Sequence, residues 1–288
     1  MSSFQDFLRL AVSVMRRLDA WLPPEAAEPD WQASAYRWRK NGQGGVLEAL
    51  PHPHTFAVSK LAAVDGQAAK LVRNTEQFLD GRPANNVLMT GARGTGKSSL
   101  VKAMLHEYAD RGLRLIEVDK SDLTALPALL TLVAGRPEKF IVFCDDLSFE
   151  DGEDGYKALK TALDGGLSQR CDNVLVYATS NRRHLMPEYM DENLGSGRGE
   201  VHPKEAVEEK VSLSDRFGLW LSFYPFDQND YLQAVENWLA DFGLQLDDTA
   251  RHAALNWAQT RGSRSGRTAW QFVCDWAGRP PQARKVFD

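Results

Sequence analysis

The chain has 288 residues, of which 43% are hydrophobic and 25% are charged. This is the composition of an ordinary soluble globular protein, and the length allows one large domain or a core with a small second domain. The net charge is −5, so no global positive field attracts nucleic acid or an anionic membrane. No segment approaches the roughly 18 uninterrupted apolar residues of a membrane span. The three cysteines form no paired spacing, which suits reduced thiols. We therefore expect a cytoplasmic protein with no membrane partner.

The N-terminal residues 3–20 predict an amphipathic helix, because their apolar residues recur at helical spacing. Packing of this helix on its own domain is the favoured interpretation, and docking to a partner is the alternative. Pro23-Pro24 is expected to end the helix. The apolar positions are Phe4, Phe7, Leu8, Ala11, Met15 and Leu18.

Residues 23–55 are rich in proline, glycine, glutamate and tryptophan, and they show no regular period. Aromatic residues here are interleaved with basic ones, a mixture that can bind nucleic acid by stacking and charge. Packing of the aromatic rings onto the core is the favoured interpretation. The residues concerned are Trp31, Tyr36 and Trp38, with Arg37, Arg39 and Lys40 between and after them.

The stretch from Asn86 to Leu100 has the order short apolar strand, glycine loop and helix. Its loop reads Gly-x-x-x-x-Gly-Lys-Ser, from Gly91 to Ser98. Glycines let the backbone turn tightly and aim its N–H groups inward, and the helix brings its positive end to the same point. This order predicts a loop that binds the phosphates of a nucleotide. Lys97 would reach the β- and γ-phosphates, and the Ser98 hydroxyl would bind Mg²⁺.

Further helices and strands are expected on both sides of this loop in the sequence. A helix is expected from about Ala62 to Leu79, and a second strand from Leu113 to Val118. Ser121 is expected to cap a helix from about Leu123 to Val133.

The apolar run from Phe140 to Cys144 ends in two acidic residues, Asp145 and Asp146. Central strands of a doubly wound parallel sheet are buried on both faces, and ligands lie at their carboxyl ends. The two carboxylates therefore fall where the phosphates are. Asp145 would hold Mg²⁺, directly or through water, and Asp146 would polarise the attacking water. Another buried strand, Asn173 to Ala178, leads to Asn181, which is placed to orient that water.

Acidic and glycine residues follow at 150–155, but without the ligand spacing and closing glutamate of an EF-hand loop, so we expect a solvated loop. A helix is expected from Tyr156 to Leu163. Residues 186–212 are polar, with a helix expected from Pro203 to Lys210. Leu219 to Phe223 is the fifth strand candidate, and the pattern then becomes helical.

Taken in order, these motifs resemble an AAA+ ATPase. Four segments are also similar to one bacterial family of predicted AAA+ ATP-binding proteins that has no assigned physiological function. They are residues 91–99, 143–150, 178–185 and 212–219. The resemblance covers about Phe56 to the C-terminus.

The resemblance implies an α/β fold, a P-loop NTPase parallel sheet flanked by helices, with strand order 5-1-4-3-2 and a small C-terminal helical lid. Three parts are expected. Residues 1–55 form a helical or irregular extension, residues 56–226 the AAA+ nucleotide-binding core, and residues 227–288 the lid.

The resemblance also implies roles for individual residues. Asn181 matches sensor 1, Arg216 the arginine finger of a neighbouring subunit, and Arg267 the sensor 2 arginine. Val64 stands where many AAA+ proteins contact adenine. Asp145 and Asp146 resemble the Walker B motif, and the Walker A motif is Gly91, Ala92, Arg93, Gly94, Thr95, Gly96, Lys97, Ser98 and Ser99.

The implied function is Mg²⁺-dependent hydrolysis of ATP to ADP and phosphate. A homo-oligomeric ring or filament, with Arg216 acting in trans, is expected to remodel or load a macromolecular partner such as another protein. The pair Asp145-Asp146 stands where many AAA+ motors have Asp-Glu, and no aromatic–glycine pore loop is found. A slow ATP-dependent assembly switch or scaffold is therefore the alternative. A small-molecule phosphotransferase is a third reading, disfavoured by Arg216 and the lid.

Nucleic acid is a further candidate partner. It rests on four arginines and on kinship with loader-like AAA+ branches, and the acidic net charge disfavours it. The arginines are Arg182, Arg183, Arg261 and Arg264.

Overall fold

The computed structural model describes residues 2–19, 28–42, 44–149, 153–164, 171–182, 185 and 213–285. They belong to two compact units, Met1–Asp30 and Trp31–Asp288. Among the described residues, no helix combines the length and the apolar character needed to span a membrane. Four expected features lie outside the described residues: the helix 203–210, positions 150–152 of the acidic loop, Pro23-Pro24 and Arg183.

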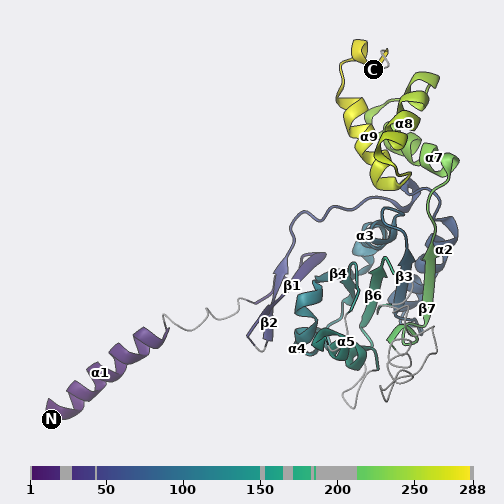
Figure 1. The fold of residues 1–288 in the computed structure, drawn as a ribbon. Helices are drawn as coiled ribbons and strands as arrows, with labels where there is room; N and C mark the ends of the chain where they lie inside the picture. Colours follow the sequence, from purple (N-terminus) through teal and green to yellow (C-terminus); the bar gives the residue numbers. More distant parts are fainter. Residues whose placement is uncertain are drawn as a thin grey trace, which may run out of the picture. The chain divides into compact units, whose positions relative to one another are not determined.

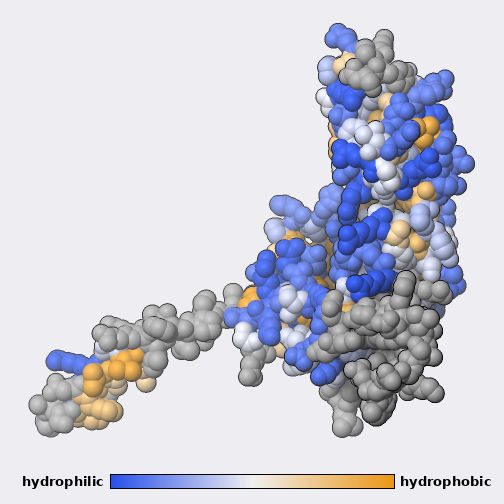
Figure 2. Space-filling model, in the orientation of Figure 1, coloured by the Kyte–Doolittle hydropathy of each residue, from blue (hydrophilic) through white to orange (hydrophobic). Residues whose placement is uncertain are grey.

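The first unit contains helix α1, Ser2–Asp19. The predicted N-terminal helix is thereby confirmed. Figure 2 shows apolar side chains gathered on it, and those of Phe4, Phe7 and Met15 are each at least 64% exposed. An apolar stripe on one side is what the helical spacing of these residues dictates.

The second unit is built on a seven-stranded sheet with the order β2-β1-β4-β5-β6-β3-β7 (Figure 1). The five expected strands all pair in parallel with their neighbours among the five, and in their own numbering the order is 5-1-4-3-2. The predicted order is confirmed. These strands are β3 (Val87–Gly91), β4 (Leu113–Val118), β5 (Lys139–Cys144), β6 (Val174–Ser180) and β7 (Leu219–Phe223).

Two strands lie within residues 23–55, where no strand is expected from the sequence. β1 (Ala35–Asn41) pairs in parallel with β4, and β2 (Gly44–Ala49) pairs with β1 in antiparallel fashion. The irregular structure expected for residues 23–55 is therefore wrong for these two segments. They form a hairpin that widens the sheet beyond β4.

The hairpin is held by the interleaved aromatic and basic residues. Tyr36 and Trp38 are each 1% exposed and belong to the core. Arg37, on the alternate face, pairs with Glu117 of β4 at 2.7 Å. Trp31 packs against the same core cluster. The prediction that these aromatic residues pack onto the core is confirmed, and their alternation with arginine is the period of two of a strand.

Helices cover both faces of the sheet. The side chains of β5 alternate between the faces, so Val142 lies in the cluster under α4 and α5, and Ile141 in the cluster under α2 and α3. A strand buried on both sides must be apolar throughout, which explains the unbroken run at β5. The helices are α2 (Asp65–Leu79), α3 (Lys97–Tyr108), α4 (Leu126–Val133) and α5 (Asp154–Asp164).

Helix α4 begins later than expected. A 3-10 helix, η3 (Lys120–Ala125), precedes it, and Ser121 lies inside that turn and does not cap α4. Pro127 occupies the first turn of α4, where a missing N–H costs no helical hydrogen bond. Proline therefore sets the start of the helix at Leu126, and the predicted start at Leu123 is wrong.

The C-terminal helical region has a core of its own. Asp227 caps its first helix by accepting from the backbone N–H of Asp230 at 2.8 Å, and the Asp230 side chain accepts from the N–H of Asp227 in return. The predicted change to helix after the fifth strand is confirmed. The region contains α7 (Gln228–Leu239), α8 (Asp248–Arg261) and α9 (Gly266–Gly278). Within the described residues, the other 3-10 helices are η1 (Val58–Lys60), η2 (Ala109–Arg111), η5 (Ala240–Phe242) and η6 (Pro281–Lys285).

The hairpin generates a prediction about packing. A Cβ on Gly45 would lie 2.2 Å from Cζ2 of the buried Trp38 ring, whereas a Cβ on Gly44 meets nothing closer than 3.9 Å. We expect Gly45→Ala to lower the free energy of unfolding by about 1–3 kcal/mol, the usual cost of overpacking a core. Gly44→Ala, one residue earlier in the same strand, should change it by less than about 0.5 kcal/mol. Urea denaturation of both variants checks this, and equal effects would contradict it.

Candidate functional site

The glycine loop joins β3 to α3, and two of its glycines exclude any side chain. Gly91 has φ 140° and Gly94 has φ 75°, both in the region that favours glycine. A Cβ on Gly91 would lie 2.0 Å from the carbonyl oxygen of Phe223, and one on Gly94 would lie 2.8 Å from Oγ of Ser265. The loop is therefore held between β7 on one side and the start of α9 on the other.

Lys97 begins α3 and is 6% exposed. Its Nζ donates to the carbonyl oxygens of Gly91 and Ala92 at 2.8 Å each, and to Oδ1 of Asn181 at 3.1 Å. The ammonium group is thus fixed at the carboxyl end of the sheet, as the motif predicts. A buried cation at the mouth of a glycine loop provides the charge that a phosphate requires.

The electrostatics of Lys97 depend on its neighbours. Burial lowers the pKa of its ammonium group, the charges of Asp145 and Asp146 oppose that shift, and Arg93 adds to it. Arg93 also lies 3.6 Å from Asp146, but both side chains are more than half exposed, so this ion pair is weak. Two cations and two carboxylates thus converge on one end of the loop.

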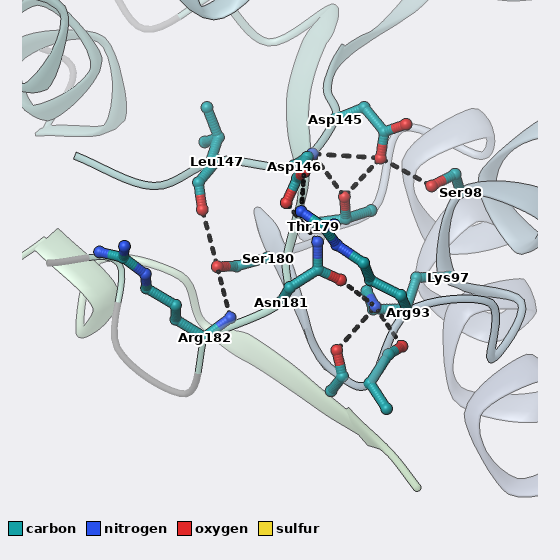
Figure 3. A network of polar contacts seen from close by, with 12 residues as sticks. Arg93, Lys97, Ser98, Asp145, Asp146, Leu147, Thr179, Ser180, Asn181 and Arg182 are labelled. Atoms are coloured by element: carbon teal, nitrogen blue, oxygen red, sulfur yellow. Dashed lines mark hydrogen bonds and ion pairs between the residues drawn. The ribbon is translucent and has the colours of Figure 1, made fainter. Parts of the chain in front are cut away.

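The carboxylate of Asp145 joins three parts of the chain (Figure 3). Its Oδ1 accepts from Ser98 Oγ at 2.6 Å and from Thr179 Oγ1 at 2.5 Å. The backbone N–H of Asp146 lies 3.2 Å from the same oxygen. The end of β5, the end of β6 and the first turn of α3 are therefore tied together at one oxygen atom.

Asp146 has an unusual backbone conformation, with φ 51°. Its N–H donates to Thr179 Oγ1 at 2.9 Å, and its Oδ1 accepts from Asn181 Nδ2 at 2.5 Å. Aspartate is among the few residues that tolerate this region. The structure thus brings together Asp146 and Asn181, the two residues predicted to handle water.

Thr179 is a site residue that the sequence analysis missed. It is 1% exposed and lies near the carboxyl end of β6, two residues before Asn181, which follows the strand. A polar residue at the end of an otherwise apolar strand was the available signal, since ligands bind at such ends.

Oxygen donors suited to Mg²⁺ are present. Mg²⁺ is usually held by one or two carboxylates with water and substrate phosphates. The hydroxyl of Ser98 and the carboxylate of Asp145 lie within hydrogen-bond distance and match that donor set. In the part of the chain that the structure describes, no three His, Cys, Asp or Glu residues gather to hold a metal.

A cavity of about 610 Å³ lies over these groups, within the usual size range for cofactor sites. One part of its lining is polar and comes from the loop and strand ends. Another part is apolar and comes from the segment before α2 and from the C-terminal helical region. The polar lining includes Arg93, Gly94, Gly96, Lys97, Ser98, Ser99, Asp145, Asp146, Thr179 and Asn181, and the apolar lining includes Phe56, Leu61, Ala62, Phe226, Trp238 and Trp270.

The start of α9 touches the glycine loop. The N–H of Gly266 donates to the carbonyl oxygen of Gly94 at 2.8 Å, and Ser265 caps α9 by accepting from the N–H of Thr268. Arg267, which follows Gly266, lines the cavity. Its expected sensor 2 role stays a prediction.

Three loop residues and Val64 are not among the residues that line the cavity. Thr95 turns its hydroxyl to the carbonyl oxygen of Ala92, and Gly91 lies against β7. Val64 is 2% exposed, and its Cγ1 lies 3.5 Å from where a Cβ on Gly96 would be. Its expected contact with adenine stays a prediction.

Arg216 lies apart from the cavity of its own chain. Its Nε is 2.5 Å from Oδ1 of Asp164, at the end of α5, and it is not among the lining residues. Of the arginines considered for nucleic acid, Arg182 is exposed and Arg261 stacks on Trp257 at 4.8 Å. The structure does not bring these arginines to the site.

Comparison with known proteins gives one family match. The model of a family described as "Protein of unknown function (DUF815)" matches residues 31–280. The match begins at Trp31, so the family includes the β1–β2 hairpin, which the resemblance from Phe56 onward left out. No curated protein matches the sequence.

Solved structures give matches to the fold. Orc1 from Aeropyrum pernix, determined in complex with DNA, has 15% identity and a TM-score of 0.56, covering 79% of this chain and 63% of that one. A point mutant of RuvB from Thermotoga maritima has 12% identity and a TM-score of 0.51, covering 76% and 63%. The chain therefore spans less than two thirds of the length of these structures. At such identities the likeness shows the fold alone, which is that of AAA+ ATPases.

The contact between the loop and α9 generates a prediction. In Gly94→Ala, the added methyl group would enter the space of Ser265 and push the start of α9 from the loop. We expect affinity for ATP to fall at least about tenfold, since α9 carries part of the cavity wall. Gly81→Ala is the matched control, because Gly81 has a similar φ of 69° and nothing within 4 Å of its Cβ position. Isothermal titration of both variants with ATP measures the effect, and equal losses would mean that backbone strain alone is responsible.

Proposed function

Since the chain belongs to the DUF815 family, whose function is unknown, we propose from its own site that it is a Mg²⁺-dependent ATPase of the AAA+ type. One observation carries the proposal. Lys97, Ser98, Asp145, Asp146 and Asn181 all line a single cavity at the carboxyl end of a parallel sheet. Phosphoryl transfer depends on such positioned charges rather than on covalent chemistry.

The proposed roles follow from the contacts. Lys97, released from the loop carbonyl oxygens, would bind the β- and γ-phosphates. Ser98 and Asp145 would hold Mg²⁺, which when bound offsets the negative charge of the phosphates. Asp146 would accept a proton from the attacking water, and Asn181, already bonded to Asp146, would help to orient that water.

The other two predicted site residues are the arginines Arg267 and Arg216. Arg267 lines the cavity. It would contact the phosphates from the C-terminal helical region, which would act as the lid. Arg216 does not line the cavity of its own chain, which supports a role in trans on the site of a neighbouring subunit. Head-to-tail contacts of this kind generate rings or filaments. Such an assembly would remodel or load a macromolecular partner.

A slow nucleotide-dependent switch is the second candidate. Asp146 is one methylene shorter than the glutamate of many AAA+ motors, and its carboxylate is bonded to Asn181 and lies near Arg93. A carboxylate with these partners is less available to activate water. Nucleic acid as a partner rests only on exposed arginines and on the DNA-bound Orc1 structure.

The division of roles between Lys97 and Asp146 is testable. We expect Lys97→Ala to lose ATP binding, and Asp146→Asn to keep it while kcat falls about 10²- to 10⁴-fold, the range for a lost general base. Asparagine tolerates a positive φ, so the fold should survive the second change. Lys70→Ala, at an exposed site on α2, is the control. Equilibrium dialysis measures ATP binding, and phosphate release measures turnover. Normal ATP hydrolysis by both variants would refute these roles.

The trans role of Arg216 is tested by subunit mixing. We expect specific activity to rise with protein concentration and Arg216→Ala to reduce kcat by at least about tenfold, because arginine fingers contribute roughly 10³- to 10⁵-fold. A mixture of Arg216→Ala and Lys97→Ala should be more active than either variant alone, since each supplies what the other lacks. Arg82→Ala, which removes an arginine exposed beside Asp80, is the control. Failure of the mixture to recover activity would place the action of Arg216 within one chain.

A further inference from the structure

We propose that Thr179 is a positioning residue that sets both carboxylates of the ATPase site, Asp145 and Asp146, through one hydroxyl group. The inference rests on the proposed function and extends it to a residue outside the Walker and sensor positions. Thr179 is the second-last residue of β6. This strand lies between β5, which is followed by the two carboxylates, and β3, which leads into the glycine loop.

The direction of its hydrogen bonds is fixed by chemistry. The Thr179 hydroxyl lies 2.5 Å from Oδ1 of Asp145 and 2.9 Å from the backbone nitrogen of Asp146. A backbone N–H can only donate, and an ionised carboxylate can only accept. The single hydroxyl proton therefore points to Asp145, and a lone pair of the same oxygen receives the N–H of Asp146.

The first consequence concerns the orientation of Asp145. In the described part of the chain, the hydrogen bonds to this carboxylate come from Thr179, Ser98 and the N–H of Asp146, and all end on Oδ1. Oδ2 is left for the cation or its water. Three donors on one oxygen fix the rotation of the carboxylate, which is how outer partners tune a metal ligand.

The second consequence concerns the backbone of Asp146. Its φ of 51° lies in the left-handed region, which residues other than glycine adopt only at a cost in free energy. The bond from its N–H to Thr179 offsets part of that cost. In this conformation the side chain of Asp146 lies toward Asn181 and Arg93. One hydroxyl thus links the carboxylate expected at the metal to the carboxylate expected at the water.

The adjacent residue is a matched control. Ser180 is also fully buried, and its hydroxyl also makes two hydrogen bonds, to the carbonyl oxygen of Leu147 at 2.7 Å and from the N–H of Arg182 at 3.1 Å. Neither partner is a carboxylate of the site (Figure 3). Loss of this hydroxyl therefore reports the structural cost alone.

The experiment compares Thr179→Val, Thr179→Ser and Ser180→Ala in the full chain. Valine keeps the branched shape that suits a strand and removes the hydroxyl, whereas serine keeps the hydroxyl. Two quantities are measured: the Mg²⁺ concentration for half-maximal ATPase activity with its kcat, and the gain in ADP affinity when Mg²⁺ is added. The second quantity needs no turnover.

For Thr179→Val we expect the half-maximal Mg²⁺ concentration to rise and kcat to fall, each about 10- to 100-fold, the range for lost outer partners of a metal ligand. The Mg²⁺-dependent gain in ADP affinity should shrink equally, with Mg²⁺-free ADP affinity unchanged. Thr179→Ser should restore all three values to within about threefold, and Ser180→Ala should resemble the unaltered protein. The proposal is overturned if Thr179→Val and Ser180→Ala behave alike, or if serine fails to restore function.

Failure of the proposed function gives a different result. If the unaltered protein bound no nucleotide, the ATPase proposal and this inference would both fall. If it bound Mg²⁺ and ADP without hydrolysing ATP, only the ATPase proposal would fall. The affinity measurement would then still decide whether Thr179 positions Asp145.

Discussion

The site depends on the order of three neighbouring strands. β6 lies between β5, which is followed directly by Asp145, and β3, which leads into the glycine loop. Thr179 on β6 therefore stands beside the carboxylate of Asp145, which also reaches Ser98 at the start of α3. With another strand order, the loop and the carboxylates would lie at separate places along the sheet edge. The topology is thus what turns three sequence motifs into one site.

Much of this arrangement could be predicted. Strands buried on both faces must be apolar, so β5 and β6 read as continuous runs, and the polar residues that end them were identified correctly as neighbours. The glycine loop could be located because its Gly and Lys positions serve backbone geometry and charge. The strand order came from family resemblance, since no local pattern specifies which strands pair.

The features that were missed have physical reasons. In β1, arginines alternate with aromatic rings, and the packing of Trp38 against Gly45 becomes apparent only once the two strands pair. The start of α4 is set by Pro127, which outweighs the capping preference of Ser121. Thr179 carries no motif, because threonine is common in strands and its role depends on where its hydroxyl lies. The local sequence therefore predicts the type of an element well, but it does not predict the tertiary contacts that the element makes.

The cavity wall depends on segments far apart in the sequence. Phe56, before α2, packs edge-on against Trp238 of α7 at 5.6 Å between ring centres. Lys60 of η1 pairs with Asp241 of η5, and its carbonyl oxygen accepts from Asn237. These contacts attach the segment before α2 to the C-terminal helices. A shift of those helices would therefore move two parts of the wall together, because both share one packed surface.

The position of Arg216 bears on how a complete site could arise. The side chains of Arg216 and Asp164 are 23% and 45% exposed, so the ion pair between them is partly accessible to water. This pair orients the guanidinium group. A developing negative charge on a neighbour's nucleotide, in a cavity with less water, would attract the same group more strongly. A site shared between subunits, as proposed above, would therefore require Arg216 to exchange its contact with Asp164 for a contact with the neighbour's nucleotide.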